Sequence, residues 1–326
     1  MPTLSKRPAS AISSFFQPVP KKLKYELPPE KSEHPTYPLS IPHLPVSIEE
    51  CLNTAPATSG KPIKNQPDLD LCYFQPFIPK EIQDSLFKFL RNELFYYRVE
   101  YKINRFGTES MVKTPRYTTV FGVDETSFFA EDGKLRESQT KIAIPGNKYK
   151  CKPRPIPQCL DVLKNITENA TGESFNFCLV NYYADGSDSI AYHSDDERFL
   201  GPNPAIASFS FGAARDFLMK HKPVAPSATQ PNHPDPKPIK FTLGAGEMIL
   251  MQGPTQKNWL HSVPKRSGKG SAQGRINITF RKALVKGGTE NYYQYNVGDG
   301  HVFRWDEKRN EMVEWTGEQA FEGTMK

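Results

Sequence analysis

Short β-prone stretches, separated by turns and loops, limit the fold of this chain more than any other feature. They are rich in branched and aromatic residues and fall at 98–103, 117–122, 175–183, 205–211, 216–220, 239–243, 247–251 and 275–281. Many short strands with few helices are typical of two β-sheets that pack together or close on each other. We therefore expect a mostly β protein (α+β).

Two segments predict helices that flank the sheets. Between Pro79 and Leu94 the apolar residues recur at the spacing of one buried helical face, and Pro79 suits a first turn. Residues 158–171 show a similar pattern through Leu160 and Leu163. Ordered structure is expected to begin near Asp68.

The first 67 residues predict a disordered tail. They contain thirteen of the thirty prolines and few large apolar residues in any periodic pattern. Such a segment cannot easily bury enough apolar surface to offset the entropy of ordering it. At the other end, residues 291–326 predict a hairpin extension that packs on the main domain, with its turn at 298–300.

A short motif in the tail indicates a protein partner. In residues 9–16, Ile12 is followed three positions later by Phe15 and Phe16, which resembles the box that docks one helical turn into PCNA. Ala9 stands where a Gln is usual, and the alternative is a chance apolar cluster. The basic residues around the motif resemble a nuclear-import signal, against the alternative of solvated tail residues: they are Lys6, Arg7, Lys21, Lys22 and Lys24.

Composition excludes some classes of protein and leaves others open. A net charge of +6 permits a polyanionic partner such as nucleic acid but does not identify one. Five cysteines, without a close Cys-x-x-Cys spacing, predict reduced intracellular thiols instead of a disulfide framework or a zinc knuckle. No apolar run approaches the roughly 18 residues that span a bilayer, so we expect no membrane segment.

Three residues have the spacing of a metal site. His193 and Asp195 form a His-x-Asp pair, and a two-residue step along a strand returns both side chains to one face. His261 would then come from a neighbouring strand. Two imidazoles and one carboxylate on one face of a metal are the ligand set of non-haem Fe(II) oxygenases, although each residue alone is as consistent with an ordinary structural role.

A cluster of polar residues follows the last of these histidines. Arg275-x-Asn277-x-Thr279-x-Arg281 begins fourteen residues after His261. A guanidinium fork fits a carboxylate better than a lysine ammonium does, so this cluster could hold the carboxylate of a co-substrate. The alternative is an exposed strand face.

Four segments together resemble the AlkB family of Fe(II) and 2-oxoglutarate-dependent dioxygenases, and most closely its nuclear DNA-repair branch. They are FNFCLVNYYADGSDSIAYHSDDER, IASFSFGAARDFLMKHK, NWLHSVP and RINITFR, within residues 175–281. The resemblance implies a double-stranded β-helix (jelly roll) core with flanking helices and a nucleotide-recognition lid. On this basis the dioxygenase domain would span 68–290, with the lid at about 98–157 and the catalytic core at 172–285.

The resemblance also implies the roles of the site residues. His193, Asp195 and His261 would ligate Fe(II), and O2 would be the second co-substrate. Arg281 would hold the distal carboxylate of 2-oxoglutarate bidentately. The remaining 2-oxoglutarate contacts would be Asn181, Tyr183, Arg275 and Thr279.

The resemblance also implies residues for substrate recognition, but several of them have an alternative role. Asp196 and Glu197 would contact the base edge, or alternatively only orient Arg198. Arg105, Phe106 and Gly107 resemble a finger that fills the gap left by a flipped base, and the alternative is that Phe106 is a core aromatic after a hairpin. Arg116 would contact phosphate or substrate. The aromatic residue of the lid that stacks on the base is left open among Phe128, Phe129 and Tyr149.

The activity implied is oxidative demethylation of N-alkylated DNA bases such as 1-methyladenine and 3-methylcytosine. Fe(II), O2 and 2-oxoglutarate would be used, and formaldehyde, succinate and CO2 released. We expect a nuclear, monomeric enzyme that acts on double-stranded DNA. One alternative is the same chemistry on RNA or protein, and another is a replication-associated binding module recruited by the N-terminal box.

Overall fold

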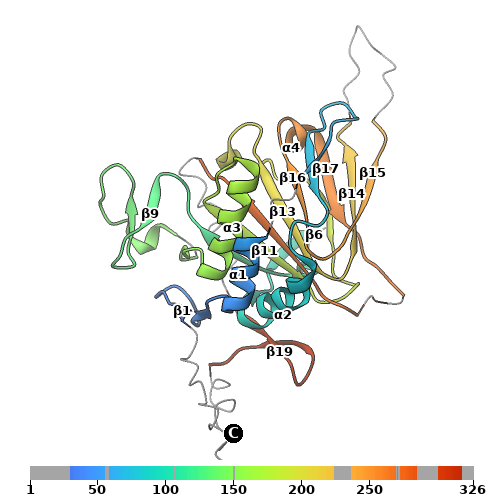
Figure 1. Ribbon diagram of the computed structural model, residues 1–326. Coiled ribbons are helices and arrows are strands. Elements are labelled where there is room, and N and C mark those ends of the chain that lie inside the picture. Colours follow the sequence, from blue (N-terminus) through green and yellow to red (C-terminus); the bar gives the residue numbers. More distant parts are fainter. Residues whose placement is uncertain are drawn as a thin grey trace, which may run out of the picture.

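The chain folds into two antiparallel sheets with a layer of helices outside the larger one (Figure 1). The computed structural model describes residues 30–55, 59–105, 107–149, 151–223, 236–268, 270, 272–284 and 300–317. Ile12, Phe15, Phe16 and Phe106 lie outside the described residues. None of the helices in the described segments has the length and apolarity to cross a bilayer.

The larger sheet has ten strands and forms the middle layer. In spatial order these are β20 (Glu311–Glu314), β19 (Val302–Asp306), β5 (Tyr96–Tyr97), β8 (Tyr117–Gly122), β11 (Phe177–Tyr183), β18 (Arg275–Arg281), β13 (Ile206–Gly212), β16 (Glu247–Met251), β4 (Leu71–Phe74) and β3 (Lys61–Ile63). Its central strands are almost entirely buried because both faces are covered.

The smaller sheet has four strands and covers one face of the larger one. Its order is β12 (Ile190–His193), β17 (Trp259–Val263), β14 (Arg215–His221) and β15 (Ile239–Leu243). Apolar residues of both sheets form a shared core, with Phe177 and Ile249 from the larger sheet and Met219 and Trp259 from the smaller. This pair of sheets is the jelly roll that the sequence predicts.

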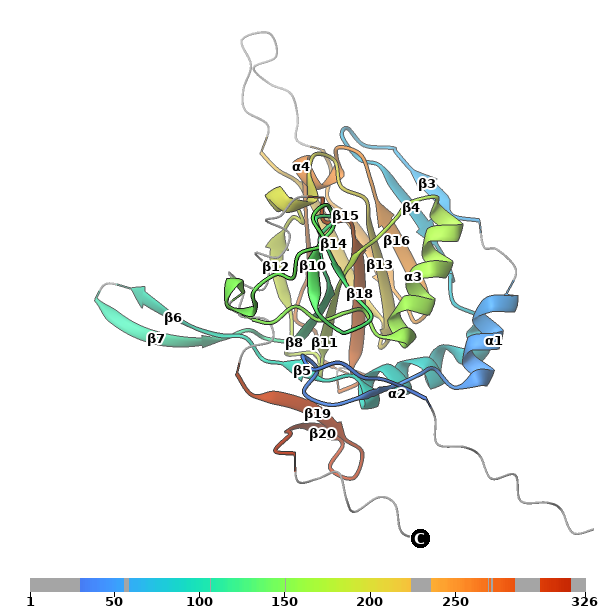
Figure 2. The same ribbon diagram turned by 90° about the vertical axis from the view of Figure 1, so that its left-hand side faces the viewer.

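Helices cover the opposite face of the larger sheet (Figure 2). They are α1 (Val46–Thr54), α2 (Gln83–Glu93) and α3 (Gln158–Thr171), and a short α4 (Thr255–Asn258) precedes β17. The predicted helix at 158–171 is confirmed residue for residue, and Gly172 ends it in the left-handed conformation with φ 71°. The other predicted helix is split into a 3-10 turn, Lys80–Ile82, followed by α2.

Three two-stranded hairpins complete the described structure, apart from two further 3-10 turns at Gly146–Lys148 and Arg198–Leu200. The hairpins are β1 (Lys31–Ser32) with β2 (Ile41–Pro42), β6 (Glu100–Arg105) with β7 (Thr108–Lys113), and β9 (Ser127–Phe129) with β10 (Leu135–Glu137). The β6–β7 hairpin projects from the body of the molecule (Figure 2). A C-terminal hairpin is formed by β19 and β20, but its turn lies between Asp306 and Glu311 and not at 298–300 as predicted. Strand β19 extends the larger sheet through β5.

Two predicted boundaries are wrong. The segment 30–67 is not a disordered tail where it is described, because Ile41, Leu44, Ile48 and Leu52 are buried in the core beneath the helices. Isolated apolar residues in a Pro-rich stretch carried no periodic signal, yet they pack against distant residues. Likewise, the lid is not continuous over 98–157, because β8 within this range is a buried strand of the larger sheet.

The corrected boundary makes a prediction about stability. Ile48→Ala removes a side chain that is 4% exposed within the core and should lower the free energy of unfolding by about 2–5 kcal/mol. Val46→Ala, two positions earlier in α1 and 70% exposed, should change it by less than about 0.5 kcal/mol. Urea denaturation of both variants measures the difference, and equal stabilities would show that α1 does not pack on the domain.

Candidate metal and co-substrate site

A cavity of about 850 Å³ lies between the two sheets and contains the candidate site. The larger sheet contributes residues of β8, β11, β13 and β18 to its wall, and the smaller sheet contributes residues of β12, β14 and β17. Along β18, side chains alternate between the two faces of the sheet. Ile276, Ile278 and Phe280 therefore enter the core beneath the helices, while the polar residues at 275, 277, 279 and 281 face the cavity.

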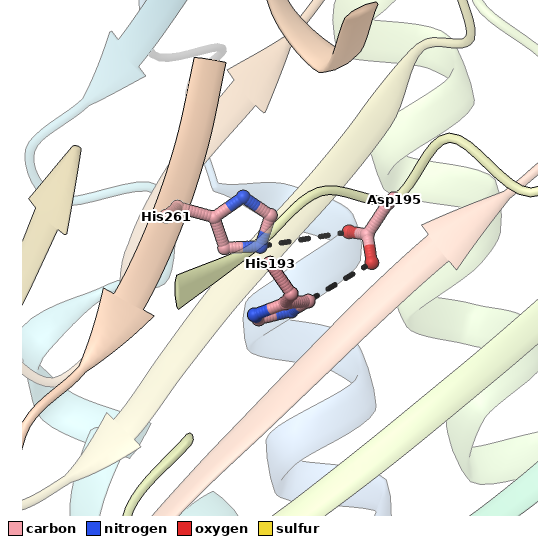
Figure 3. A group of neighbouring side chains, drawn as sticks. All are labelled: His193, Asp195 and His261. Carbon is pink, nitrogen blue, oxygen red and sulfur yellow. Dashed lines mark ion pairs between the residues drawn. The ribbon is translucent and has the colours of Figure 1, made fainter. Parts of the chain in front are cut away.

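The three predicted metal ligands converge in this cavity (Figure 3). Strand pairing places His193 of β12 directly opposite His261 of β17. Asp195 Oδ1 lies 4.0 Å from His193 Nε2, and Asp195 Oδ2 lies 3.8 Å from His261 Nε2. The sequence argument placed His193 and Asp195 on one strand, but β12 ends at His193 and Asp195 follows it outside the strand.

Hydrogen bonds and burial prepare the imidazoles to bind a cation. His193 Nδ1 lies 2.9 Å from the Ala191 carbonyl oxygen, which can only accept, so Nδ1 carries the proton and Nε2 keeps its lone pair. Burial lowers the pKa of His261 to about 3, and this keeps the ring neutral. Phe217 stacks on the His261 ring with centroids 5.3 Å apart and restrains its orientation.

Asp195, the carboxylate among the three ligand candidates, is buried and charged. Burial alone would raise the pKa of Asp195, but the charge of the Arg281 guanidinium outweighs it, so this pKa lies below its ordinary value. The Asp195 backbone N–H donates to Gln256 Oε1 at 2.8 Å, which fixes the chain at this residue. An anionic carboxylate beside two imidazoles fits a divalent cation such as Fe(II).

Arg281 occupies a different place from the one that sequence reasoning gave it. Its Nη2 donates to Asp195 Oδ1 at 2.8 Å, and its Nη1 donates to Glu197 Oε1 at 3.2 Å. Both terminal nitrogens are therefore already engaged with carboxylates of the chain. Its Nε is buried without a hydrogen-bond partner, and the bidentate grip on a co-substrate carboxylate that was expected of Arg281 stays a prediction.

Arg275 has two unpaired nitrogens, one more than Arg281. Its Nη2 donates to Ser210 Oγ at 2.8 Å, whereas its Nε and Nη1 are buried without a hydrogen-bond partner. Burial lowers the pKa of Arg275 to about 10, and the group stays charged at neutral pH. A buried cation with unpaired donors is costly, and an anionic ligand would supply the missing acceptors.

The other predicted co-substrate residues surround Arg275. Strand pairing places Tyr183 opposite Arg275 and Asn181 opposite Asn277. Asn181 Oδ1 accepts from Arg116 Nε at 3.1 Å and from Thr118 Oγ1 at 2.9 Å, while Thr279 donates to the Leu179 carbonyl oxygen. All of these side chains line the cavity, so Fe(II) and a dicarboxylate such as 2-oxoglutarate both find suitable partners there.

Some of the residues predicted to recognise substrate line the cavity, and others lie at the β6–β7 hairpin. Arg116, Asp196 and Glu197 line the cavity. Lys222 Nζ lies 2.8 Å from Asp196 Oδ2, whereas Glu197 Oε2 is buried without a partner, and burial raises the pKa of Glu197. Arg105 and Gly107 border the turn of the β6–β7 hairpin, where Gly107 has φ 81°.

The aromatic residues proposed for the lid do not reach the cavity. Phe129 packs edge-on against His34 with centroids 5.1 Å apart, and Lys141 lies over the Phe128 ring. Tyr149 lines a separate, smaller cavity together with Phe129. Sequence reasoning missed Gln256 and Ser210, which bond Asp195 and Arg275, because neither their residue types nor their spacing marks them.

The support of Asp195 by Gln256 can be measured directly. Gln256→Leu removes the acceptor for the Asp195 N–H and should weaken Mn(II) or Fe(II) binding about 10- to 100-fold, as loss of a ligand-orienting partner usually does. Isothermal titration with the metal alone gives the affinity. Gln252→Leu is the matched control, because Gln252 bonds Glu173 outside the cavity. Equal affinities in the two variants would contradict this role of Gln256.

Comparison with known proteins agrees with this site. The family model described as "2OG-Fe(II) oxygenase superfamily" matches residues 70–281. The chain is 32% identical over 247 residues to "DNA oxidative demethylase ALKBH2" of Arabidopsis thaliana, covering 71% of this chain and 73% of the relative. Its identity to the mouse protein of the same name is 33% over 214 residues, covering 65% of this chain and 80% of that protein.

A second group of relatives matches a shorter part of the chain at higher identity. "Alpha-ketoglutarate-dependent dioxygenase alkB homolog 3" of Bos taurus is 45% identical over 149 residues, which is 46% of this chain and 49% of that protein. The cofactors of the superfamily are Fe(II), 2-oxoglutarate and O2, and the cavity residues fit them. The chain therefore belongs to the AlkB family of the 2OG-Fe(II) oxygenase superfamily.

Proposed function

We propose that the chain is an oxidative DNA demethylase that repairs N-alkylated bases, such as 1-methyladenine and 3-methylcytosine, in double-stranded DNA. The observation that carries the dioxygenase chemistry is the meeting, in one cavity, of His193, Asp195 and His261 with the unpaired donors of Arg275. The choice of DNA rests on relatives whose names are DNA oxidative demethylase.

The chain's residues divide the work of binding. His193, Asp195 and His261 hold Fe(II), and Arg275 holds the distal carboxylate of 2-oxoglutarate with help from Asn181, Tyr183 and Thr279. Arg281 keeps Asp195 ionised and in place. When bound, Fe(II) and 2-oxoglutarate with O2 supply the oxidation of a C–H bond next to nitrogen, which yields formaldehyde, succinate and CO2.

Recognition of the base falls to further polar residues that line the cavity. Glu197 has one carboxylate oxygen on Arg281 and the other buried without a partner, so it can bond the polar edge of a base. Asp196 and Arg116 contribute further polar groups to the same cavity. Arg105 and Gly107 border the turn of the projecting β6–β7 hairpin, and Phe106 stands between them in the sequence. These three residues replace the flipped base in the stack of a duplex.

The N-terminal segment directs the enzyme in this proposal. Residues 9–16, through Ile12, Phe15 and Phe16, bind PCNA and bring a monomeric enzyme to replicating DNA. The basic residues on either side of this box direct the protein to the nucleus. The support for both roles is the sequence pattern alone.

The reassignment of the two arginines has a kinetic consequence. Arg275→Gln should raise the KM for 2-oxoglutarate about 10- to 100-fold, since hydrogen bonds to a charged group contribute about 1.5–3 kcal/mol. Succinate release at varied 2-oxoglutarate measures it, with Arg266→Gln as a control outside the cavity. An unchanged KM in Arg275→Gln, together with a raised KM and normal metal binding in Arg281→Gln, would restore the original assignment to Arg281.

The activity itself is tested with defined oligonucleotides. Formaldehyde and succinate release are measured with Fe(II), ascorbate and 2-oxoglutarate on single- and double-stranded DNA carrying 1-methyladenine. Turnover should favour the duplex and vanish in His193→Ala, whereas His301→Ala, which alters a histidine on the C-terminal hairpin, should retain it. Succinate without base repair would move the substrate to RNA or protein, and no succinate at all would favour a binding module.

A further inference from the structure

The C-terminal hairpin, formed by β19 and β20, is attached to the strand that leads into the projecting β6–β7 hairpin. β19 lies beside β5 (Figure 2), and Phe303 and Val302 of β19 pair with Tyr96 and Tyr97. β6 begins at Glu100, shortly after β5 ends. No described residue of the C-terminal hairpin lines the cavity, so any effect of this hairpin on the site must pass through the strands that it contacts.

The C-terminal hairpin is anchored on α2. Arg304 Nη2 donates to the Asn92 carbonyl oxygen at 2.8 Å, and Asn92 Nδ2 donates to Glu307 Oε1 at 2.6 Å. The guanidinium carbon of Arg91 lies 4.0 Å from the centroid of the Trp305 ring, within the range of a cation–π contact. Because these contacts fix β19 against the helical layer, β19 can in turn restrain β5.

Two contacts meet at Tyr117, the first residue of β8. The Phe303 ring packs edge-on against the Tyr117 ring, with centroids 5.3 Å apart. The guanidinium carbon of Arg98 lies 4.9 Å from the same centroid. Arg98 Nε also donates to the Thr114 carbonyl oxygen at 3.2 Å, and the Thr114 N–H donates to the Val99 carbonyl oxygen at 2.9 Å. Arg98 therefore joins Tyr117 to both ends of the β6–β7 hairpin, where they leave the body.

The same arginine reaches the segment that precedes the metal-ligand strand. Arg98 Nη2 lies 3.5 Å from Oδ1 of Asp188, which is buried. The Ser189 N–H donates to the Pro115 carbonyl oxygen at 2.8 Å. β12, which ends at the ligand candidate His193, follows directly. The base of the β6–β7 hairpin is thus tied to the strand that carries a metal-ligand candidate.

The outer part of the β6–β7 hairpin has little to fix its direction. Residues 108–111 of β7 are exposed, and the ion pairs Lys102–Glu109 and Lys113–Glu100 join the hairpin's own strands. A two-stranded hairpin alone is marginally stable in water, so its orientation depends on the contacts at its base. A hairpin that enters a duplex while the target base lies at the metal needs a fixed position relative to that metal.

We propose that the C-terminal hairpin is a positioning element, which sets the direction of the β6–β7 hairpin through Phe303, Tyr117 and Arg98 and so determines the preference for duplex over single-stranded DNA. A single strand has no base stack to fill, so turnover on it does not require the β6–β7 hairpin at a fixed position. Loss of these contacts therefore lowers turnover on the duplex selectively. This inference rests on the proposed action on duplex DNA.

Strand preference tests the contact made by Phe303. In Phe303→Ala the ratio of kcat/KM on double-stranded to that on single-stranded DNA carrying 1-methyladenine should fall about 10- to 100-fold, as expected when a reacting geometry shifts by about 1 Å. Met312→Ala is the matched control, because Met312 packs partly buried against the same core from the outer strand β20. This control should keep the ratio. An equal fall in both variants would overturn the route through Phe303.

Variants of Arg98 separate positioning from a general loss of structure. Arg98→Gln should lower the ratio as Phe303→Ala does, whereas Arg98→Lys keeps a cation near the Tyr117 ring and should retain more of it. Arg98 and Phe303 lie outside the cavity wall, so Mn(II) affinity and the KM for 2-oxoglutarate should not change. A change in these two quantities with a normal ratio would overturn the proposal.

A double variant tests whether the two side chains act through one route. Phe303→Ala combined with Arg98→Gln should lower the ratio by less than the product of the two single effects, because both contacts converge on Tyr117. An effect equal to that product would show two independent contributions and overturn the shared route.

Hydrogen exchange tests the link between the hairpins without DNA. Peptides from residues 108–116 report on the Thr114 amide at the base of the β6–β7 hairpin. They should exchange about 2- to 30-fold faster in Arg98→Gln and Phe303→Ala, the range for loss of one cation–π or aromatic contact. Arg136→Gln, which removes an ion pair with Asp132 away from this base, should leave the exchange unchanged.

The two readouts separate this proposal from the proposed function. Faster exchange in the variants of a protein that does not demethylate DNA would refute the repair function but keep the link between the hairpins. Normal exchange and normal strand preference in Phe303→Ala and Arg98→Gln, with active wild-type protein, would refute the positioning role and keep the repair function.

Discussion

The buried pair between Arg281 and Asp195 is the interaction on which the site depends. Arg281 lies on the larger sheet and Asp195 follows the edge strand of the smaller one, so the pair joins the two sheets at the metal site. Both side chains are almost fully buried, and removing two charges from water costs several kcal/mol for each ion. That cost is tolerable because the nitrogens and oxygens meet at hydrogen-bonding distance and Glu197 and Gln256 satisfy neighbouring groups.

The same pair explains how the site can exist before its metal is bound. Before the metal binds, the two imidazoles alone would give Asp195 no compensating positive charge, and burial would favour the protonated form of its carboxyl group. The guanidinium supplies the charge from the opposite side, and the carboxylate stays available as a ligand. The pKa of Arg281 is raised, because the negative charges of Asp195 and Glu197 outweigh the effect of its burial.

Strand β18 distributes polar and apolar residues between the two cores. A shift of one residue in its pairing would send Arg275 and Arg281 into the apolar core beneath the helices and Ile278 into the cavity. The register is therefore strongly specified, and with it the positions of Asn181 and Tyr183 on the neighbouring strand. This also explains why the pattern Arg-x-Asn-x-Thr-x-Arg could be read as one strand face from the sequence.

Local patterns were enough to locate most of the strands, the helix at 158–171 and the three ligand candidates, because alternation, helical spacing and residue type act over a few neighbouring positions. They failed where a contact joins distant segments. Ile48 looks unremarkable in a Pro-rich stretch but is buried by the helical layer, and the choice between Arg275 and Arg281 turns on which one meets Asp195.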